Sequence, residues 1–283
     1  MKRPQEIAAE EATMNTILNL TTAFEGIASM RIASIKNQVL KAQDFFDQLW
    51  SMYNQLRVDS LFRFGRQETE AITDKELLIA ITAEGGFSGD IDQNLINWML
   101  KSYDPEKQDI VIIGHHGAVQ LSQVGVEYKK YYKLPERDDH INVAPLVRQV
   151  HDYRNTIVYY QTYVSLMVQD IKRIEVKKAV AEAGSKVDKS EEIISEASYI
   201  FEPSSFAVVA HLERSMVDIT ISQAILESKL AQYASRFRAM SVAKDKASES
   251  HDQLHWQYNQ TKRSLADERL KEIINGLKKA STA

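Results

Sequence analysis

The side chains best placed for chemistry lie around a glycine-rich loop, Glu84–Gly85–Gly86–Phe87–Ser88–Gly89, that follows a short apolar run at 77–82. A buried strand, a glycine loop and a helix in this order form the arrangement with which nucleotide-binding folds hold phosphate groups. The loop departs from that chemistry, because it has neither the GxGxxG nor the GxxxxGK(S/T) spacing and no lysine at the start of the next helix. The carboxylates of Glu84, Asp90 and Asp92 would repel a phosphate. A nucleotide-binding enzyme that uses this loop is therefore an alternative that the composition of the loop disfavours.

The seven histidines are the other candidates for metal or acid–base chemistry, since the chain has no cysteine. His115 and His116 are adjacent, so on a helix their side chains would point about 100° apart and would not share a metal ion. His251 and His255 are four residues apart on a predicted helix, a spacing that can bind zinc, but no nearby carboxylate completes a ligand set. We expect this pair to pack or to form interhelical hydrogen bonds. The polar turn at Asp138–His140 would need distant ligands, so we predict no metal, no cofactor and no catalytic site.

Composition favours a soluble protein. Of its 283 residues 26% are charged, and the formal net charge is only −4, so there is no electrostatic case for nucleic acid as the main partner. The lack of cysteine excludes disulfides and thiol catalysis. No apolar run approaches the ~20 residues needed to cross a bilayer, and the acidic N-terminus is unlike a secretory signal or a transit peptide. We expect any contact with a membrane to go through another protein.

The elements that position these residues begin with a long C-terminal segment. From 204 to 283 the chain has no proline and a single glycine, and its apolar residues advance by steps of four and three. A 3.5-residue repeat keeps one seam of a helix against a partner, so the spacing predicts a coiled-coil helix of ~75 residues, on the order of 110 Å long. The predicted seam comprises Leu226, Leu230, Tyr233, Phe237, Met240, Ala247 and Leu254, with a second row at His251, Tyr258 and Leu265.

Residues 5–62 carry the same helical signature. A helix of this length needs a partner for its apolar stripe. We predict that the two terminal helices pair with each other as an intramolecular antiparallel coiled coil, and a parallel homodimer through either helix is the competing arrangement. The predicted seam comprises Met14, Ile17, Thr21, Phe24 and Ala28, then, beyond a polar interruption at Arg31, Ile35, Val39, Ala42, Phe46, Leu49, Tyr53 and Leu56.

The middle of the chain alternates strands and helices. Short apolar or β-branched runs predict the strands, and helical apolar spacing predicts the helices between them. Alternation of this kind favours a mainly parallel sheet with crossover helices. The predicted strands are 77–82, 109–113 and 156–168, the predicted helices are 91–99, 118–124 and one from Pro145, and 126–134 is predicted to be extended.

The predicted fold class is therefore α+β and mainly α. A long antiparallel coiled coil of N- and C-terminal helices carries a central Rossmann-like α/β domain. The predicted parts are an N-terminal helix (1–64), an α/β head (65–202, with a solvated insertion or linker at 178–198) and a C-terminal helix (203–283).

Several short stretches, in family order over nearly the whole chain, resemble motifs of the gamma subunits of F-type rotary ATPases (ATP synthases). Thr82–Gly89 resembles the family's TSDRGLCG loop, and Gly114–Gly117 (GHHG) stands where the family has GKKG. Glu10 and Glu11 replace a basic run, so we interpret the chain as a divergent member. The other matches, with the family's form in parentheses, are Asn15–Thr16 with Thr22–Phe24 (NT…TKAM), Asn94–Leu95 (NSNL), Tyr199–Pro203 (YIYEP), Ala224–Lys229 (ALLESKASE), Arg236–Met240 (RMVAM) and Tyr258–Asn259 (YNKAR).

The resemblance implies a central rotor stalk with no catalytic site of its own, in a complex that couples ion flow to ATP synthesis or hydrolysis. The coiled coil would insert into an alpha/beta hexamer of catalytic and non-catalytic nucleotide-binding subunits. The head would sit on a membrane rotor ring beside an epsilon-like subunit, so the protein would lie peripherally at the cytoplasmic face of the cell membrane. A coiled-coil adaptor whose α/β head binds a partner is the alternative.

The resemblance also implies contact residues, for each of which an ordinary solvated or seam role is the alternative. Two expected contacts with the membrane ring or the epsilon-like subunit are Phe201 and Glu202. The expected contacts with the catalytic ring are Thr22, Ala23, Phe24, Arg236, Lys262, Arg263, Asp267 and Glu268.

Overall fold

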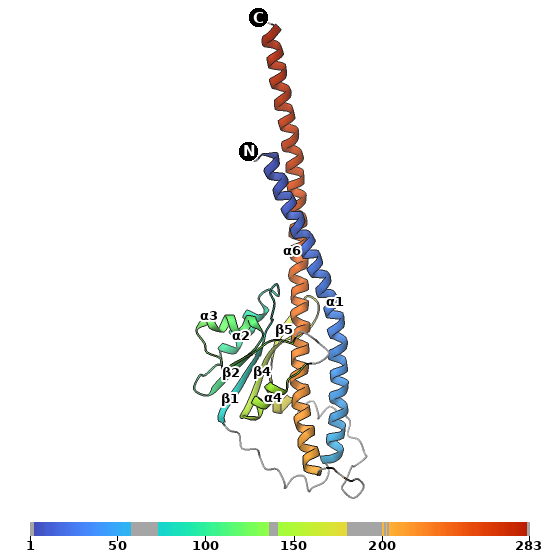
Figure 1. Cartoon of the computed structure of the whole chain (residues 1–283), viewed down its shortest axis with the longest axis vertical. Coiled ribbons are helices and arrows are strands. Elements are labelled where there is room, and N and C mark those ends of the chain that lie inside the picture. The colour runs from blue at the N-terminus through green and yellow to red at the C-terminus, as the bar shows by residue number, and fades with distance from the viewer. Residues whose placement is uncertain are drawn as a thin grey trace. The chain divides into compact units, whose positions relative to one another are not determined.

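The computed structural model describes residues 3–57, 73–135, 141–179, 200, 202 and 204–281. In this part of the chain two very long helices, α1 (Pro4–Arg57) and α6 (Ser205–Ser281), precede and follow a sheet with shorter helices (Figure 1). Both predicted terminal helices are confirmed over their described residues. None of the described helices is long and apolar enough to span a membrane. The elements between α1 and α6 are β1 (Thr73–Ile81), α2 (Ile91–Leu100), β2 (Gln108–Ile113), α3 (His115–Val124), β3 (Lys130–Tyr132), α4 (Ala144–His151), β4 (Tyr153–Tyr163) and β5 (Gln169–Glu175).

The chain forms two compact units. One is Ala28–Arg236, which contains the sheet, and the other combines Met1–Ile27 with Phe237–Ala283. Helices α1 and α6 each contribute to both units. The boundaries predicted at 64–65 and 202–203 involve residues outside the described part, as do most residues of the predicted linker at 178–198. That division of the chain therefore stays a prediction.

The sheet has the mainly parallel, doubly wound character that the alternation of strands and helices predicts. Its strand order is β3-β2-β1-β4-β5, and the first four of these strands run parallel to one another. The continuous apolar runs of β1 and β2 are buried on both sides, as central parallel strands require. The chain moves outward from β1 through β2 to β3 and then returns to place β4 on the other side of β1. The strand order thus reverses between β1 and β4.

Helices cover both faces of this sheet (Figure 1), because successive side chains of a buried strand point to opposite sides. Leu78 and Ala80 of β1 face α2 and α3, with which they form one apolar cluster. Leu77, Ile79 and Ile81 point the other way, into a cluster with α4 and α6. The members that α6 supplies to the second cluster are Ile221, Ala224 and Ile225.

The strand predicted at 156–168 is wrong in its last five residues, 164–168. Strand β4 ends at Tyr163, and the backbone N–H groups of Val164 and Ser165 donate to the carbonyl of Val168, at 3.2 and 2.9 Å. Strand β5 then returns antiparallel to β4. The turn contains no glycine or proline and three of its residues are valine or methionine, so its composition imitates a strand. Of the stretch 126–134, only β3 is a strand.

Within the unit Ala28–Arg236, α1 packs on α6 through a fully buried isoleucine. Ile35 forms an apolar cluster with Leu226 and Leu230, both of which were predicted seam residues. Val39 and Tyr233 pack against this cluster. Because residues of α1 meet residues of α6 in the same chain, the intramolecular pair is confirmed over the competing parallel homodimer.

In the other unit the two helices pair antiparallel. Glu25 Oε2 lies 2.7 Å from Lys244 Nζ, and Glu11 Oε1 lies 2.8 Å from His255 Nδ1. The residue number on α6 therefore rises as the number on α1 falls. The predicted seam of α6 is confirmed here by the burial of Met240 and Ala247 (4–7% exposed).

The seam of α1 differs from the prediction at two positions. Ile17 and Phe24 are 40% and 37% exposed, so their assignment to the seam is wrong. Leu18 and Glu25 take these places and are half-buried. Hydrophobicity alone predicts Ile17 and Phe24 as seam residues. In the structure Glu25 lies in the seam instead of Phe24, because Lys244 forms an ion pair with it. The fully or nearly buried residues of α1 in its first 35 positions are Ile7, Thr21, Ala28 and Ile35, all separated by multiples of seven.

Candidate functional site

The glycine loop follows β1 at the carboxyl edge of the sheet, next to the point where the strand order reverses. In doubly wound folds this crevice is the usual place for a ligand, with the first turn of the following helix directed at it. Here the following helix is α2, and its second residue is Asp92. The chemistry of the crevice therefore depends on which groups bind the loop.

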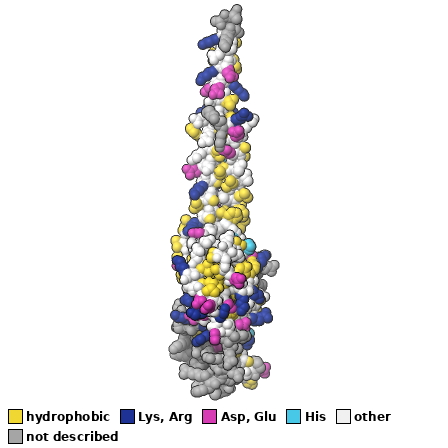
Figure 2. All heavy atoms as spheres, turned by 90° about the vertical axis from the view of Figure 1, so that its left-hand side faces the viewer, with side chains coloured by type: hydrophobic (Ala, Val, Ile, Leu, Met, Phe, Trp, Pro, Cys, Tyr) yellow, Lys and Arg dark blue, Asp and Glu magenta, His cyan; other side chains and the backbone are white. Residues whose placement is uncertain are grey.

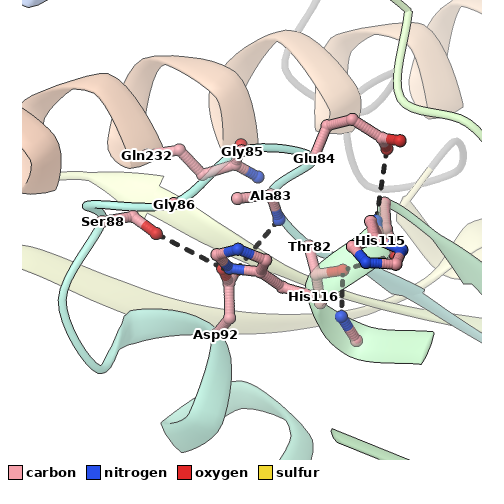
Figure 3. A network of polar contacts seen from close by, with 12 residues as sticks. Thr82, Ala83, Glu84, Gly85, Gly86, Ser88, Asp92, His115, His116 and Gln232 are labelled. Atoms are coloured by element: carbon pink, nitrogen blue, oxygen red, sulfur yellow. Dashed lines mark hydrogen bonds and ion pairs between the residues drawn. The ribbon is translucent and has the colours of Figure 1, made fainter. Parts of the chain in front are cut away.

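Asp92 is buried beneath the loop and holds it (Figure 3). Its Oδ1 accepts hydrogen bonds from the backbone N–H of Ala83 (3.1 Å) and from Gln161 Nε2 (2.8 Å). Its Oδ2 accepts from Ser88 Oγ (3.4 Å) and lies 3.0 Å from His116 Nδ1. This one carboxylate thus connects the loop, α2, α3 and β4.

Polar side chains of α6 cover the crevice and bond to β4. Ser228 Oγ donates to Gln161 Oε1, and Gln232 Nε2 donates to Ser228 Oγ at 2.9 Å. Gln161 and Ser228 are fully buried and Gln232 is 5% exposed, so these bonds are shielded from water. Buried polar groups are expected to be paired in this way, because an unpaired one costs about 1–3 kcal/mol.

The next turn of α6 binds the loop backbone directly. Ser235 Oγ donates to the carbonyl of Ser88 at 2.6 Å. Arg236 Nε and Nη2 donate to the carbonyls of Gly86 and Gly85, each at 3.1 Å. The loop therefore presents three of its carbonyls to α6, and Asp92 binds the backbone N–H of Ala83 just before the loop. The carboxylate of Asp92 in the first turn of α2 disfavours the nucleotide-binding alternative, because it would repel a phosphate.

Glu84 anchors the start of the loop to the neighbouring elements. Its Oε2 accepts from the backbone N–H groups of His115 and Leu134, each at 3.2 Å, and its Oε1 accepts from Tyr131 Oη at 2.8 Å. Burial and then the hydrogen bond with Glu84 raise the pKa of the Tyr131 phenol to about 12. Glu84 is thus an internal clamp on the first turn of α3 and on β3.

Replacing Glu84 with alanine is expected to destabilise the unit Ala28–Arg236 by about 1–3 kcal/mol, because three donors lose their acceptor. The phenol pKa of Tyr131 should fall from about 12 towards its ordinary value of 10. Urea unfolding and an ultraviolet absorbance titration of the phenol measure the two effects. Glu127→Ala removes an exposed carboxylate nearby in the chain and should change neither. Equal behaviour of the two variants would contradict the clamp.

The four histidines considered in the sequence have distinct surroundings. His116 meets Asp92, whereas only the backbone N–H of its neighbour His115 makes a described bond. His251 Nε2 and His255 Nδ1 lie 3.8 and 2.8 Å from Glu11 Oε1 of α1, and His251 Nδ1 lies 3.4 Å from Asp252 Oδ1 of its own helix. The expected interhelical hydrogen bond is confirmed for His255. Among the described residues no group of three or more histidine and carboxylate side chains could hold a metal ion. The turn at 138–140 lies outside the described residues.

The described contact residues lie at four places in the chain. Thr22, Ala23 and Phe24 lie on the exposed side of α1, one residue beyond the buried Thr21. Arg236 is bound to the glycine loop in the other unit. Glu202 is exposed, and Phe201 lies outside the described residues. The remaining four, which are exposed on the last part of α6, are Lys262, Arg263, Asp267 and Glu268.

Within their unit, Thr22–Phe24 and the last four residues are at different levels of the helix pair. The ion pair of Glu25 with Lys244 places Thr22–Phe24 near the start of this stretch of α6. Lys262 is about five turns further along the helix, at 3.6 residues per turn. The structure thus brings none of the first group next to the last.

The sequence did not predict the polar network centred on Asp92. Its members come from residues 83–92, from β4 and from α6, and no local pattern connects them. One usable signal was the polar row Ser228, Gln232 and Ser235, whose steps of four and three lie on one face of a helix. A polar row on a buried helix requires polar partners, and here the partners are Gln161 and the glycine loop.

Comparison with known proteins now identifies the family. The sequence model of the family described as ATP synthase matches residues 4–279. The chain is 21% identical to the ATP synthase gamma chain of Cytophaga hutchinsonii, with 96% of this chain and 97% of that one covered. It is 24% identical to the ATP synthase gamma chain of Pelotomaculum thermopropionicum, with 91% and 92% covered.

Solved structures share the fold. A chain of the Euglena gracilis mitochondrial ATP synthase, from a structure of its OSCP, F1 and c-ring, matches with a TM-score of 0.63 at 16% identity, covering 97% of this chain and 94% of that one. A chain of the central stalk and c-ring of the Tetrahymena thermophila mitochondrial ATP synthase matches with a TM-score of 0.59 at 16% identity, covering 79% and 99%. A family match over almost the entire length, together with this shared fold, means that the chain belongs to the ATP synthase family, in which the relatives that it matches are gamma chains.

Proposed function

We propose that this protein is the gamma subunit of an F-type ATP synthase, the central rotor stalk, and has no catalytic site of its own. Its partners are then an alpha/beta hexamer, an epsilon-like subunit and a membrane rotor ring. The stalk couples ion flow through that ring to rotation inside the hexamer. We place it peripherally at the cytoplasmic face of the cell membrane, attached through the ring and not by a span of its own.

The observation that carries this proposal is the exposed apolar stripe on the last part of α6. Since Glu11 meets His255 in an antiparallel pair, Pro4 at the start of α1 lies near residue 262 of α6. Beyond this level no described residue of α1 covers α6, yet the helix continues to Ser281. Four apolar side chains with helical spacing are exposed there, namely Leu270 (59%), Ile273 (60%), Ile274 (44%) and Leu277 (66%).

A single helix with such a stripe is expected to have another protein around it, because contiguous exposed apolar surface marks an interaction site. Figure 2 shows further hydrophobic side chains at the surface of the helical part of the chain, between charged ones. The exposed large hydrophobic side chains of α1 include Leu20, Phe24 and Ile27. A rotor shaft inside a ring needs a surface of this type, since tight ionic contacts with one position of the ring would oppose rotation to the next.

Contact with the catalytic ring is therefore assigned to the exposed Thr22, Ala23 and Phe24 of α1 and to the last part of α6 with Lys262, Arg263, Asp267 and Glu268. Arg236 is bonded to carbonyls of the glycine loop, so its proposed contact with the catalytic ring requires one side chain to bind both. Glu202, which is exposed, and Phe201 are assigned to the membrane ring or the epsilon-like subunit.

Reconstitution with candidate alpha and beta subunits tests the proposal. The purified chain alone should show no ATPase activity, and it should co-purify as one copy with an alpha/beta hexamer whose ATPase activity it changes. An affinity purification from the source cells that recovers no nucleotide-binding ring would contradict it. A stable self-dimer and an unrelated partner would favour the adaptor alternative.

The double variant Ile273→Asp/Leu277→Asp is expected to weaken binding to the hexamer at least about tenfold. Burial of one such side chain contributes roughly 1.5–3 kcal/mol, and 1.4 kcal/mol is a factor of ten in affinity. The control Lys271→Asp/Asn275→Asp places two carboxylates at the same spacing and changes the net charge by −3 instead of −2, but it keeps the stripe and should bind within a factor of about three. Titration of labelled chain with the hexamer measures both. Equal loss in the two variants would show that charge, and not the stripe, decides binding.

A further inference from the structure

His116 occupies an unusual place in the network below the glycine loop. It is about a third exposed, yet its Nδ1 lies 3.0 Å from a carboxylate oxygen of Asp92, whose side chain is 2% exposed. Three of the four partners of Asp92 are neutral, namely Ala83 N–H, Ser88 Oγ and Gln161 Nε2. The imidazole of His116 is therefore the one directly bonded group among the described contacts of Asp92 that can carry a compensating positive charge.

We propose that His116 is a proton-operated latch, which in its protonated form fastens the glycine loop to α6 through Asp92 and in its neutral form loosens it. This is a property of the chain itself, and it holds or fails independently of the proposed function.

The charged groups that face His116 come from three elements. Asp92 of α2 and Glu84 of the loop favour the protonated ring, whereas Arg236 of α6 opposes it. Arg236 is bonded to the carbonyls of Gly85 and Gly86 and does not bond to Asp92 among the described contacts. The proton on His116 therefore decides whether the buried carboxylate has a bonded counter-charge.

The direction of the effect follows from the balance of these groups. The hydrogen bond with Asp92 raises the pKa of His116 above its ordinary value of 6.5, burial acts against this shift, and the charge of Asp92 adds to it. A raised pKa in the folded protein means that the stabilisation is fully present below the unfolded value. It is lost as the pH rises through the folded value.

Loss of the proton is expected to act on the loop because Asp92 is its support. A neutral imidazole can still donate one hydrogen bond, but a buried carboxylate without a counter-charge is costly. The same carboxylate binds Ser88, whose carbonyl binds Ser235 of α6, and Gln161, which binds Ser228 of α6. Two of the connections from this region to α6 thus pass through the partners of Asp92, and Arg236 makes a further connection directly to the loop carbonyls.

The loop has a feature that such a latch would control. Phe87 is 61% exposed and has a φ of +69°, a conformation that a residue with a side chain adopts only when its surroundings hold it there. The bonds on either side of it, from Arg236 to Gly86 and from Ser235 to Ser88, are those surroundings. When the latch loosens, Phe87 should leave this conformation more often.

Hydrogen–deuterium exchange of the full-length chain tests the latch, with rates corrected for the intrinsic effect of pH. When the pH is raised from about 6, below the ordinary pKa of histidine, to about 9, the peptide containing residues 83–92 should exchange several-fold faster. A peptide from β2 should not change. A corrected rate at 83–92 that is the same at both pH values would overturn the proposal.

Three variants separate the latch from other titrating groups. His116→Lys, which restores the lysine of the family motif, keeps a charge throughout and should exchange slowly at both pH values. His116→Gln has no charge and should exchange fast at both. His115→Gln, the matched neighbour, should behave like the natural chain. The proposal would be overturned if the exchange rate still depended on pH in both variants of His116. It would also be overturned if that dependence disappeared in His115→Gln.

A second measurement covers the case in which the variants of His116 fail to fold. Histidine signals of the natural chain, followed by nuclear magnetic resonance and assigned with the help of His115→Gln, should include one that titrates above 6.5. The amide signals of the loop should shift with the same midpoint. Loop amides that do not follow a histidine titration would contradict the latch.

Discussion

Gly114→Ala is expected to destabilise the unit Ala28–Arg236 more than an alanine at any other described glycine. A Cβ at Gly114 would lie 2.0 Å from the carbonyl oxygen of Thr82 and 2.6 Å from its carbon, and the residue has a φ of +96°. The backbone of Thr82 cannot move away, because it is part of the hydrogen-bonded sheet edge: its N–H donates to Ile113 O at 2.8 Å. Overpacking and a left-handed backbone together cost about 3–5 kcal/mol.

Gly125→Ala is the matched control for this prediction. Gly125 ends α3 with a φ of +77°, but a Cβ there would meet no heavy atom within 4 Å. Only the cost of the left-handed backbone conformation remains, so we expect the free energy of unfolding to fall by about 1 kcal/mol. Urea unfolding followed by circular dichroism measures both variants. If they lose the same stability, the close approach of Thr82 to Gly114 is not what requires glycine there.

Ile35→Ala is expected to cost about 2–4 kcal/mol, because it leaves a cavity between α1 and α6. Ile35 is fully buried and packs against Leu226 and Leu230, with Val39 at the edge of the same cluster. Alanine favours the helix, so the loss comes from packing and not from the backbone. We expect faster hydrogen exchange in the part of α1 from 28 onward.

Leu40→Ala removes a similar volume from the exposed side of the same helix. Leu40 is 54% exposed, so its replacement should change the free energy of unfolding by less than about 0.5 kcal/mol. The pair of variants isolates the contribution of the α1–α6 contact in this unit. Equal losses would mean that α1 is stabilised by something other than its contact with α6.

The sequence was most informative where a repeat extends over many residues. The two terminal helices follow from apolar steps of three and four, and the strands β1 and β2 from runs that only a doubly covered sheet can bury. The sequence was misleading where two neighbouring rows of residues on α1 could each form the seam. At Ile17 and Phe24 the more apolar row faces solvent, since the seam needs small or ion-paired residues such as Thr21 and Glu25. The turn after Tyr163 was missed because valine and methionine occupy positions where glycine or asparagine usually marks a turn.

The site was predictable in position but not in chemistry. The glycine loop was located correctly after β1, and its acidic composition argued against a phosphate. The contact of Asp92 with the loop region depends on Gln161, which lies 69 residues after Asp92, and on Ser228, which lies 67 residues after Gln161. Such an arrangement exists only after the sheet has formed and α6 has packed on it. Family motifs carried information on these positions because they match the segments 82–89 and 224–229, in which several of the partners lie.

The contacts of α6 inside the unit Ala28–Arg236 change in kind along the helix, and this sets its mechanical compliance. At Ile221, Ala224 and Ile225 the helix is held by apolar surface, whose separation admits water to a dry core. From Ser228 to Arg236 its contacts with β4 and the glycine loop are hydrogen bonds, each of which contributes only about 0.5–1.5 kcal/mol net. Under load the apolar contacts at 221–225 should stay intact, whereas the hydrogen bonds at 228–236 should break and re-form. The glycine loop is thus attached where the helix can give way without the sheet losing its core.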